Sequence, residues 1–469
     1  MASRVGWMTV AGVLRGNGSV TQGFRLGGSR CLATSATSQS EARLSKAELA
    51  KLGPSDFERM TDGEVLDLVK AKVIPSYKLE AVLKDLDRAV MLRRMLVEEE
   101  SKRPGSLADL AHEGYEYSSV HGACCENVVG YCAIPVGISG PLNIDGEMVH
   151  VPMATTEGVL VASTHRGMSA LNKCGGVRTM ETQAGGMTRA PLVRLPTATE
   201  AVAVKNWIEE PQNYVEVAAA FNSTSRFGRL VSITPILAGR NLYLRFRSKT
   251  GDAMGMNMVS KGVEEALRCV KQYFPNLEVC SVSGNVCTDK KSSAVNWTMG
   301  RGQSVIAEAV LTKNVVESVL KSSVKHVMEL NVNKNLIGSA MAGTLGGFNA
   351  HAANIVAAIF IATGQDPAQV VESSSCITQF EENEDGSMYC SVSMPSIEVG
   401  TVGGGTHLPS QRAALRLLGI SGSHTEAPGG NSKKLARVVA ASVLAGELSL
   451  MSALAAGHLV RAHMEHNRR

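Results

Sequence analysis

The hydrophobic pattern contains a stretch without charged side chains that runs from Asn335 to Gln365. It is long enough to cross a bilayer, which needs about 20 mostly apolar residues. Glycines interrupt its first half, however, and Asn349, His351 and Asn354 occupy its middle, where a lipid-facing span carries Leu and Ile. The pattern therefore predicts a buried helix of a soluble protein rather than a transmembrane helix.

We place this helix at residues 350–363, after a turn at Gly346-Gly347, with Asn349 as its N-cap and Gly364 as its stop signal. Asp366 follows the C-terminal end, where the helix dipole disfavours an anion. A carboxylate in that position should have a cationic partner.

The remaining periodicity predicts both helices and strands. Helices are expected over 45–97, with an interruption at 75–77, and over 199–208, 257–274 and 433–466; strands are expected over 131–135, 149–154, 215–220, 230–237 and 241–247. Segment 195–282 is therefore predicted to be an α+β unit. At 469 residues the chain is too long for one ordinary core, and we expect two or three domains.

Composition changes the interpretation of the N-terminus. Residues 1–40 contain four arginines, no Asp, Glu or Lys, and many Ser, Thr and Gly, which is typical of a mitochondrial presequence; a disordered tail is the alternative. The chain carries 47 basic and 43 acidic residues, so the charges balance without these four arginines. A nucleic acid partner is therefore not indicated.

Ten cysteines occur, two of them adjacent at Cys124 and Cys125, without a C-x-x-C spacing. This indicates neither a zinc site nor a disulfide framework, and it fits a reducing compartment. We expect no metal cofactor.

Three places could carry chemistry. Glu157 stands between two apolar segments and either caps the following helix or acts as an acid with a raised pKa. The run Asp289-Lys290-Lys291 is either a solvated turn or a pair of cations that stabilises an oxyanion and binds a substrate carboxylate. His463, at the end of the last predicted helix, is either a surface residue or a proton donor whose charge the helix dipole favours.

Glycine-rich segments at 251–258, 403–406 and 429–432 are candidates for phosphate binding. None matches G-x-G-x-x-G or G-x-x-x-x-G-K-[ST], so neither a Rossmann nor a P-loop site is indicated. Backbone N–H groups at the starts of the helices after Met254 and Gly430 could still bind anions.

Taken together, these segments resemble the eukaryotic-type (class I) hydroxymethylglutaryl-coenzyme A reductases. The similarity runs from about Ile74 to Asn467 and includes the segments 126–130, 153–158, 252–258, 288–291, 364–366, 403–406 and 446–451. It implies reduction of 3-hydroxy-3-methylglutaryl-CoA (HMG-CoA) to mevalonate and free coenzyme A with two NADPH, by way of bound mevaldehyde. This is the committed step of sterol and isoprenoid synthesis.

The resemblance assigns catalytic roles to Glu157, Lys290, Asp366 and His463. Lys290 would stabilise the oxyanion, Asp366 would keep Lys290 charged and Glu157 protonated, and His463 would protonate the departing thiolate. Substrate contacts are implied for Tyr77, Arg189, Ser283, Lys291, Lys334 and Asn354. Nucleotide contacts are implied for Ser225, Arg226, Phe227, Asp252, Met254, Gly255, Met256, Asn257, Gly403, Gly404, Gly405 and Thr406, with Arg226 suited to the 2′-phosphate.

The implied fold is multidomain, of α+β and α/β type. Its parts are a presequence (1–44), a helical N-terminal domain (45–125), a large coenzyme A and substrate domain (126–190 and 293–469), an inserted ferredoxin-like NADPH domain (191–282) and a connecting catalytic loop (283–292). Family members are homodimers or homotetramers with shared active sites.

Many relatives carry an N-terminal membrane anchor, and the predicted presequence stands in its place here. This favours a soluble protein of the mitochondrial matrix, with the cytosol as the alternative. Arg469 stands where regulated relatives carry a serine, so kinase control is not expected there. Rival interpretations are the family's NADH-using class and a coenzyme A-binding protein without catalysis. Arg226 argues against the first, and the four filled catalytic positions argue against the second.

Overall fold

The computed structural model describes residues 54–57, 59–182 and 185–457 of the 469-residue chain. All of them belong to one compact unit. The predicted presequence and His463 lie outside the described residues.

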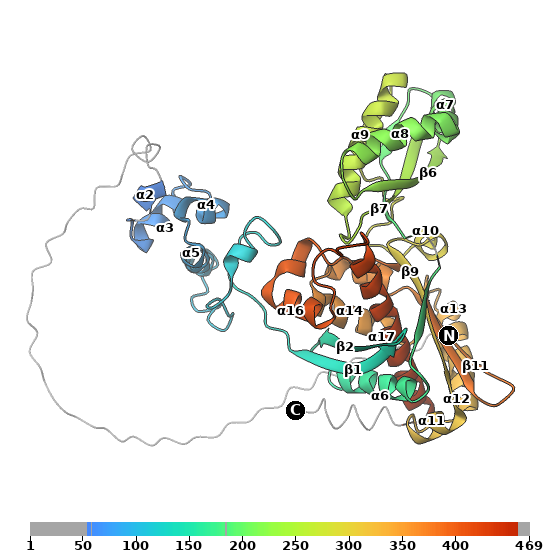
Figure 1. Ribbon diagram of the computed structural model, residues 1–469. Coiled ribbons are helices and arrows are strands. Elements are labelled where there is room, and N and C mark those ends of the chain that lie inside the picture. Colours follow the sequence, from blue (N-terminus) through green and yellow to red (C-terminus); the bar gives the residue numbers. More distant parts are fainter. Residues whose placement is uncertain (1–53, 58, 183–184, 458–469) are drawn as a thin grey trace, which may run out of the picture. The chain divides into compact units, whose positions relative to one another are not determined.

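The described chain begins with helices, as the charge pattern predicts (Figure 1). A capping box starts the second of them, because Thr61 Oγ1 accepts from the Glu64 N–H and the Glu64 carboxylate accepts from the Thr61 N–H. The predicted interruption at 75–77 is confirmed, since Pro75 precedes a short 3-10 turn. These elements are α2 (Pro54–Phe57), α3 (Asp62–Lys70), η1 (Ser76–Lys78), α4 (Leu79–Leu83), α5 (Leu86–Glu100) and η2 (Tyr117–Ser119).

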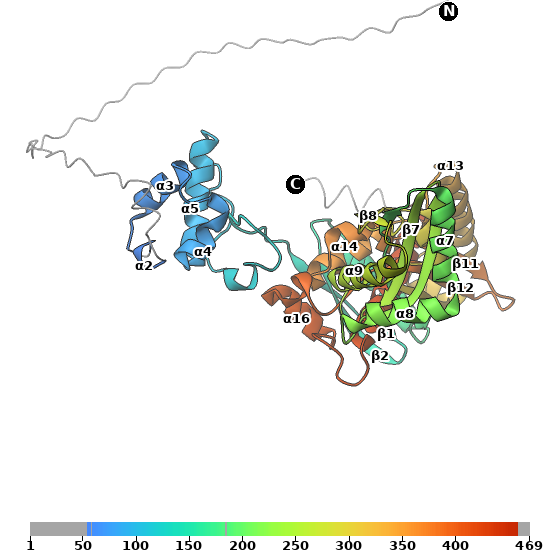
Figure 2. The ribbon, with the colours of Figure 1, turned by 90° about the horizontal axis from the view of Figure 1, so that it is seen from above.

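An antiparallel sheet with its own hydrophobic cluster occupies the middle of the sequence (Figures 1 and 2). From β5 to β8 its elements follow the β-α-β-β-α-β order of ferredoxin-like folds, with neighbours β8-β5-β7-β6. The predicted helices at 199–208 and 257–274 and strands at 230–237 and 241–247 are confirmed. The elements are β4 (Met187–Arg189), β5 (Leu192–Arg194), α7 (Ala198–Glu209), α8 (Pro211–Ser223), β6 (Arg229–Ala238), β7 (Asn241–Lys249), α9 (Met256–Tyr273) and β8 (Glu278–Ser281).

The strand predicted at 215–220 is wrong, because these residues lie inside α8. Pro211 occupies the first turn, where its missing N–H costs nothing. Val217 and Phe221, four residues apart, are both buried on one helix face. A short apolar run of this kind does not separate a strand from a buried helix by pattern alone.

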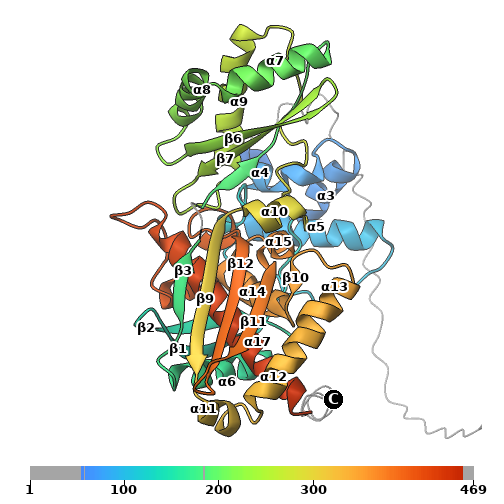
Figure 3. The ribbon, with the colours of Figure 1, turned by 90° about the vertical axis from the view of Figure 1, so that its right-hand side faces the viewer.

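The larger hydrophobic cluster is built around a second sheet of strand order β10-β11-β12-β9-β3 (Figure 3). Only the β10–β11 pair is parallel. The strand predicted at 149–154 is confirmed within a separate hairpin, whereas the one predicted at 131–135 is wrong, and Pro135 has no N–H for a ladder. The strands are β1 (Val136–Ile144), β2 (Glu147–Ala154), β3 (Arg178–Glu181), β9 (Gln303–Leu311), β10 (Gly347–Phe348), β11 (Cys376–Glu382) and β12 (Met388–Ile397).

Helix α17 (Gly430–Ala455) is the central core helix and packs against α6 (Leu160–Asn172), α14 (Ala352–Thr363), β9 and β12. It is long and apolar enough to span a membrane, but 78% of its most apolar window is buried inside the protein. A core helix passes the same test of length and hydropathy. The sequence pattern placed this helix at 433–466, and the structure ends it at Ala455.

Helix α14 confirms the buried helix predicted in the uncharged stretch, with one correction at its start. The helix begins at Ala352 with His351 as N-cap, and Asn349 Oδ1 accepts from the Ala352 N–H. The N–H groups of Ala350 and His351 donate to the buried Glu447 carboxylate, each at 2.7 Å. Gly364 ends the helix in the left-handed conformation, as predicted.

The first half of the uncharged stretch is helical as well, which the pattern did not predict. Helix α12 (Val324–Leu330) continues into a π-helix, η3 (Asn331–Gly338), and then into α13 (Ser339–Met341). The buried side chains of Asn331 and Asn335 hydrogen-bond one another inside the π-helix, so polar residues face the core here and conceal the helical period.

Candidate active site

Lys290 and Asp366 form an ion pair, with Nζ 2.8 Å from Oδ2. Lys290 belongs to the loop between β8 and α10 (Ala294–Met299), and Asp366 follows α14 directly after its Gly364 stop. The hydrogen bond that Lys290 donates to the Asp366 carboxylate raises the pKa of Lys290, so the ammonium form is favoured. The cationic partner that the sequence demanded for Asp366 is therefore confirmed.

The loop that carries Lys290 has an unusual backbone. Asn285, Thr288 and Lys290 all have positive φ, at 64°, 58° and 58°. The Lys290 N–H donates to Glu372 Oε1 at 2.7 Å, and the Thr288 carbonyl accepts from Asn296 Nδ2 at 3.0 Å. Left-handed conformations of non-glycine residues cost energy and persist where contacts hold them. The loop therefore has a defined shape that directs the Lys290 side chain.

Glu157 is exposed and does not cap the following helix. The N-cap of α6 is Val159, which forms no side-chain capping bond. The Glu157 carboxylate instead accepts from Asn354 Nδ2 at 3.3 Å, so a residue of α14 orients it. A cavity of about 170 Å³ lies here, and its lining also includes Ile361 of α14. The helix-cap alternative for Glu157 is therefore wrong.

A larger pocket of about 800 Å³ joins two of the glycine-rich segments to Asp366. Its wall contains Met254 to Asn257 from the start of α9 and Gly403 to Thr406 from η5 (Gly404–His407) and the residue before it. Ile361 of α14 lines both this pocket and the Glu157 cavity. The structure therefore brings predicted nucleotide contacts next to a predicted catalytic carboxylate.

The chemistry of this pocket suits a dinucleotide phosphate. Helix α9 starts there behind Gly255, which has φ 88° and offers no side-chain cap, so its first N–H groups have no side-chain acceptor. At Gly403 and Gly404 an added Cβ would meet no atom within 4 Å, so open space lies beside this backbone. Where Gly364 passes Gly405, a Cβ on Gly364 would lie 2.4 Å from the Gly405 carbonyl oxygen. Only glycine permits that approach.

The other predicted nucleotide contacts lie outside this lining. Ser225 Oγ accepts from the N–H groups of Phe227 and Gly228, and the exposed Arg226 guanidinium stacks over the Phe227 ring at 5.6 Å. Asp252 is buried, and its carboxylate accepts from backbone N–H groups at the start of α17 and in the loop before it. In this structure Asp252 holds these loops together, and its role as a nucleotide contact stays a prediction.

Residues 89–468 match the family model described as hydroxymethylglutaryl-coenzyme A reductase. The chain belongs to this family. The resemblance drawn from the sequence motifs is therefore confirmed.

Curated relatives in this reductase family come from several eukaryotes. The chain is 63% identical over 366 residues to 3-hydroxy-3-methylglutaryl-coenzyme A reductase 2 of Dictyostelium discoideum, covering 78% of this chain and 69% of the relative. It is 55% identical to the 3-hydroxy-3-methylglutaryl-coenzyme A reductases of Strongylocentrotus purpuratus and Blattella germanica, covering 87% and 88% of this chain. The chain spans about half of these two relatives, 44% and 48% of their lengths.

Solved reductase structures share the fold. A class II 3-hydroxy-3-methylglutaryl-CoA reductase from Streptococcus pneumoniae, bound to NADPH in open conformations, aligns with TM-score 0.57 and 17% identity over 86% of this chain and 100% of that chain. A second structure of the Streptococcus pneumoniae enzyme aligns with TM-score 0.56 and 18% identity. The mixed α/β fold class is thus confirmed, while the domain boundaries stay a prediction.

Of the six predicted substrate contacts, Asn354 lies beside Glu157, and the other five fall into two groups. Three are tied to residues in or near the Lys290 loop or α9: Arg189 Nε donates to Ser260 Oγ, Ser283 Oγ lies 3.4 Å from Cys287 Sγ, and Lys291 Nζ donates to the Asp289 carbonyl. Tyr77 on η1 and Lys334 on η3 are exposed. Within the described ranges, neither of these two forms a hydrogen bond or ion pair with another predicted site residue.

The assignment of His463 rests on sequence alone, because this residue lies outside the described part of the chain. Helix α17 ends at Ala455, and Gly457 has φ 69°. The part of the predicted helix from 433 to 455 is therefore confirmed, the helix α17 ends there, and the role of His463 stays a prediction.

The sequence analysis missed four side chains that surround the Lys290 loop: Arg301, Glu372, Gln369 and Glu398. Arg301 is fully buried, and Gln369 Nε2 donates to Asp289 Oδ1 at 3.2 Å. A charged residue inside an apolar run, as Glu398 is between Ile397 and Val399, was the available signal. Arg301 stands between Gly300 and Gly302, and Glu372 stands between Val371 and Ser373, so neither lies inside an apolar run.

Proposed function

We propose that this chain reduces HMG-CoA to mevalonate and free coenzyme A, with two NADPH per turnover and mevaldehyde held between the two reductions. The observation that carries the proposal is the Lys290–Asp366 pair, whose carboxylate lines the pocket formed by the nucleotide segments. Family membership supports the substrate, and the NADPH-bound relative of the same fold supports the cofactor.

Four side chains have separate roles in the two reductions. Each reduction places negative charge on a carbonyl oxygen, and the Lys290 ammonium stabilises that charge. Asp366 keeps Lys290 protonated and orients its ammonium group. Glu157, oriented by Asn354, donates the proton in aldehyde reduction, and His463 protonates the coenzyme A thiolate.

The first turn of α9 and the glycines at 403–405 would hold the phosphates of NADPH, and the Arg226 guanidinium would recognise its 2′-phosphate. The bound cofactor would supply the hydride for each reduction. Tyr77, Arg189, Ser283, Lys291, Lys334 and Asn354 contact the acyl-CoA substrate.

The active unit is a homodimer or homotetramer in which subunits share active sites. Mixing two inactive variants, Lys290→Ala and Glu157→Gln, tests this arrangement. Shared sites restore part of the activity in mixed oligomers if the two residues come from different subunits, and light scattering gives the assembly state.

The N-terminal segment directs import into mitochondria and is removed before Ser45. Its support is the arginine-rich, acid-free composition of residues 1–40. N-terminal sequencing of the native protein and cell fractionation test it, and an intact Met1 in the cytosol would refute it.

The reaction is tested by following NADPH consumption on HMG-CoA and on mevaldehyde, with NADH in parallel. We expect turnover of both substrates with a preference for NADPH. Lys290→Ala should lower kcat for both, because the loss of one oxyanion donor costs on the order of 3 kcal/mol and a charged donor more. Binding of HMG-CoA without any oxidation of NADPH would favour a coenzyme A-binding protein instead.

A further inference from the structure

Arg301 is the centre of a buried charge cluster behind the Lys290 loop. Arg301 follows α10 and precedes β9 in the sequence, and its side chain is fully buried. Nη1 contacts three carboxylates: Asp289 at 3.1 Å, Glu372 at 3.2 Å, and Glu398. Nε donates to Thr188 Oγ1 at 3.0 Å. One guanidinium thus joins the Lys290 loop, β4, α15 (Val370–Ser373) and the end of β12.

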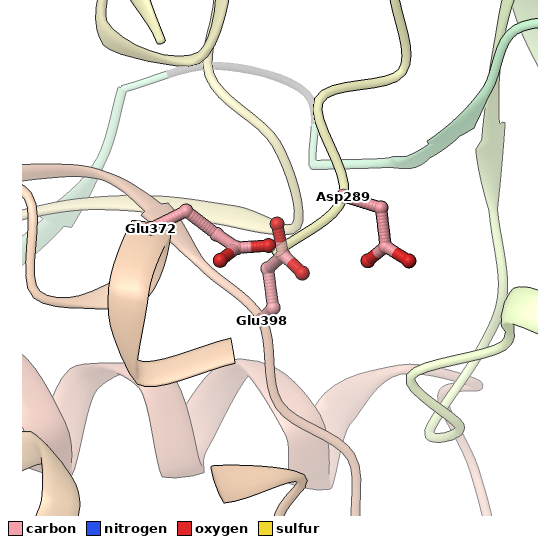
Figure 4. Close-up of side chains that lie close together, drawn as sticks. All are labelled: Asp289, Glu372 and Glu398. Atoms are coloured by element: carbon pink, nitrogen blue, oxygen red, sulfur yellow. The ribbon is translucent and has the colours of Figure 1, made fainter. Parts of the chain in front are cut away.

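The three carboxylates lie together as the ligands of a metal ion would (Figure 4). One oxygen atom from each carboxylate lies within 4.8 Å of the chosen oxygen atoms of the other two. Here the positive charge at their centre is the Arg301 guanidinium, supplied by the chain itself. Burial raises the pKa of Glu372 and raises that of Glu398 well above its ordinary value, which reduces the negative charge that one arginine must balance.

The cluster reaches Lys290 through the backbone. Glu372 Oε1 accepts both the Lys290 N–H, at 2.7 Å, and Arg301 Nη1. Lys290 has φ 58°, a conformation that needs such support. The Lys290 ammonium is about half exposed, so its direction is set by the loop and by Asp366 rather than by burial.

The cluster also reaches the nucleotide pocket. Arg301 Nη2 lies 3.0 Å from Met256 Sδ, and Gln369 Nε2 lies between Asp289 Oδ1, at 3.2 Å, and Met254 Sδ, at 3.6 Å. Met254, Met256, Gln369 and Glu398 line the large pocket. Besides the direct pair with Asp366, Arg301 therefore provides a second connection between the Lys290 loop and the wall of the pocket.

We propose that Arg301 and Glu372 are positioning residues for the reductase reaction, which fix the backbone of Lys290 and so place its ammonium group relative to the nucleotide pocket. This inference rests on the proposed function for its kinetic consequence, but the placement of Lys290 can be measured without it. Buried ion pairs contribute little net stability on average, so geometric control is the property that this cluster adds. A misplacement of about 1 Å at a reacting group can lower a rate about 100-fold.

Glu372 offers a graded test. Glu372→Gln keeps an oxygen that can accept the Lys290 N–H, whereas Glu372→Met has a similar size and no such acceptor. We expect kcat to fall roughly 100-fold in Glu372→Met and clearly less in Glu372→Gln, with KM for HMG-CoA little changed in both. Arg301→Lys should likewise retain more activity than Arg301→Gln.

The matched control is Glu308, a half-buried glutamate on β9 whose Oε2 accepts from the Tyr389 hydroxyl at 2.9 Å. Glu308→Gln and Glu308→Met make the same changes of charge and shape away from the Lys290 loop. Both should keep wild-type kcat. Thermal denaturation of every variant distinguishes an unfolded protein from a folded one in which the Lys290 ammonium group is displaced.

A second readout follows Lys290 itself. The rate of Lys290 acylation by acetic anhydride, relative to that of the exposed Lys261 on α9, is measured by peptide mass spectrometry. Release of Lys290 from Asp366 should raise this ratio in Glu372→Met and leave it unchanged in Glu308→Met. Folded Glu372→Met with unchanged kcat and unchanged ratio would overturn the inference. So would a loss of kcat with an unchanged ratio. If wild-type protein failed to reduce HMG-CoA while the ratio moved as expected, the proposed function would fall and the placement of Lys290 would stand.

Discussion

The Lys290 ammonium group lies 2.8 Å from Asp366 Oδ2, at the end of a helix whose dipole disfavours the carboxylate. Both side chains are partly exposed, at 46% and 31%, so the pair adds at most about 1 kcal/mol to stability. The pair instead keeps Lys290 protonated and fixes the direction of the Lys290 side chain. A lysine held charged beside the large pocket is suited to repeated oxyanion stabilisation.

Asp366→Asn should shift the alkaline limb of the kcat profile to lower pH. The Asp366 hydrogen bond raises the pKa of Lys290, so removing the carboxylate lowers that pKa and the ammonium form is lost earlier as pH rises. Asparagine can still accept the Ala368 N–H that Asp366 Oδ1 now accepts at 3.0 Å, which preserves the start of η4 (Pro367–Gln369). A pH–rate profile from pH 6 to 10 checks this, and an alkaline limb that does not move would contradict it.

His463→Gln and Glu157→Gln should affect different half-reactions. Only thioester reduction expels coenzyme A thiolate, so His463→Gln should lower kcat on HMG-CoA far more than on added mevaldehyde. Glu157→Gln should damage aldehyde reduction, because an amide cannot release the proton that the alkoxide needs; a general acid contributes about 10²- to 10⁴-fold. Measuring kcat for both substrates with both variants separates the roles. Equal losses on the two substrates in His463→Gln would make His463 structural and point to His458 or His466.

Glu398→Gln should change how stability depends on pH. Burial raises the pKa of Glu398 well above 4.5, so the folded protein keeps a proton that the unfolded chain releases. The free energy of unfolding then falls as pH rises from 4.5 towards the folded pKa, by at most about 1.4 kcal/mol per pH unit for one proton. Glutamine does not titrate and removes this contribution. Urea unfolding of both proteins at pH 5 and pH 7 checks it, and parallel pH dependences would disprove the assignment.

Gly167→Ala should destabilise the core, whereas Gly63→Ala should not. Inside α6, a Cβ on Gly167 would lie 1.9 Å from the Ala445 carbonyl oxygen of α17, a backbone atom that cannot rotate away. Overpacking of this kind costs at least about 1–3 kcal/mol. Gly63, in α3, has nothing within 4 Å, so alanine there should stabilise by up to about 1 kcal/mol. Thermal denaturation of the two variants gives the comparison, and equal melting temperatures would contradict the close approach of α6 and α17.

Much of the site could be predicted from the sequence, because the chemistry required particular residue types at local positions. The uncharged stretch ending before Asp366 predicted a buried helix, its glycine stop and a cationic partner, and all three are present. Motif resemblance supplied the family and the residues Glu157, Lys290 and Asp366. The predictions of the helix, its stop and the ion pair succeeded because helix periodicity, capping and dipole effects act over one or two turns of chain.

Tertiary structure decided the features that depend on contacts between distant segments. It showed that residues 215–220 pack as a helix, that Asp252 holds loops together, and that α17 ends at Ala455. It also revealed Arg301, whose partners come from four separate segments. Burial and long-range pairing determine the role of such a residue, and neither is encoded in its sequence neighbours. The sequence by itself therefore determined the family and the candidate site residues, and the packing of the folded chain decided how Lys290 and Asp366 are held together.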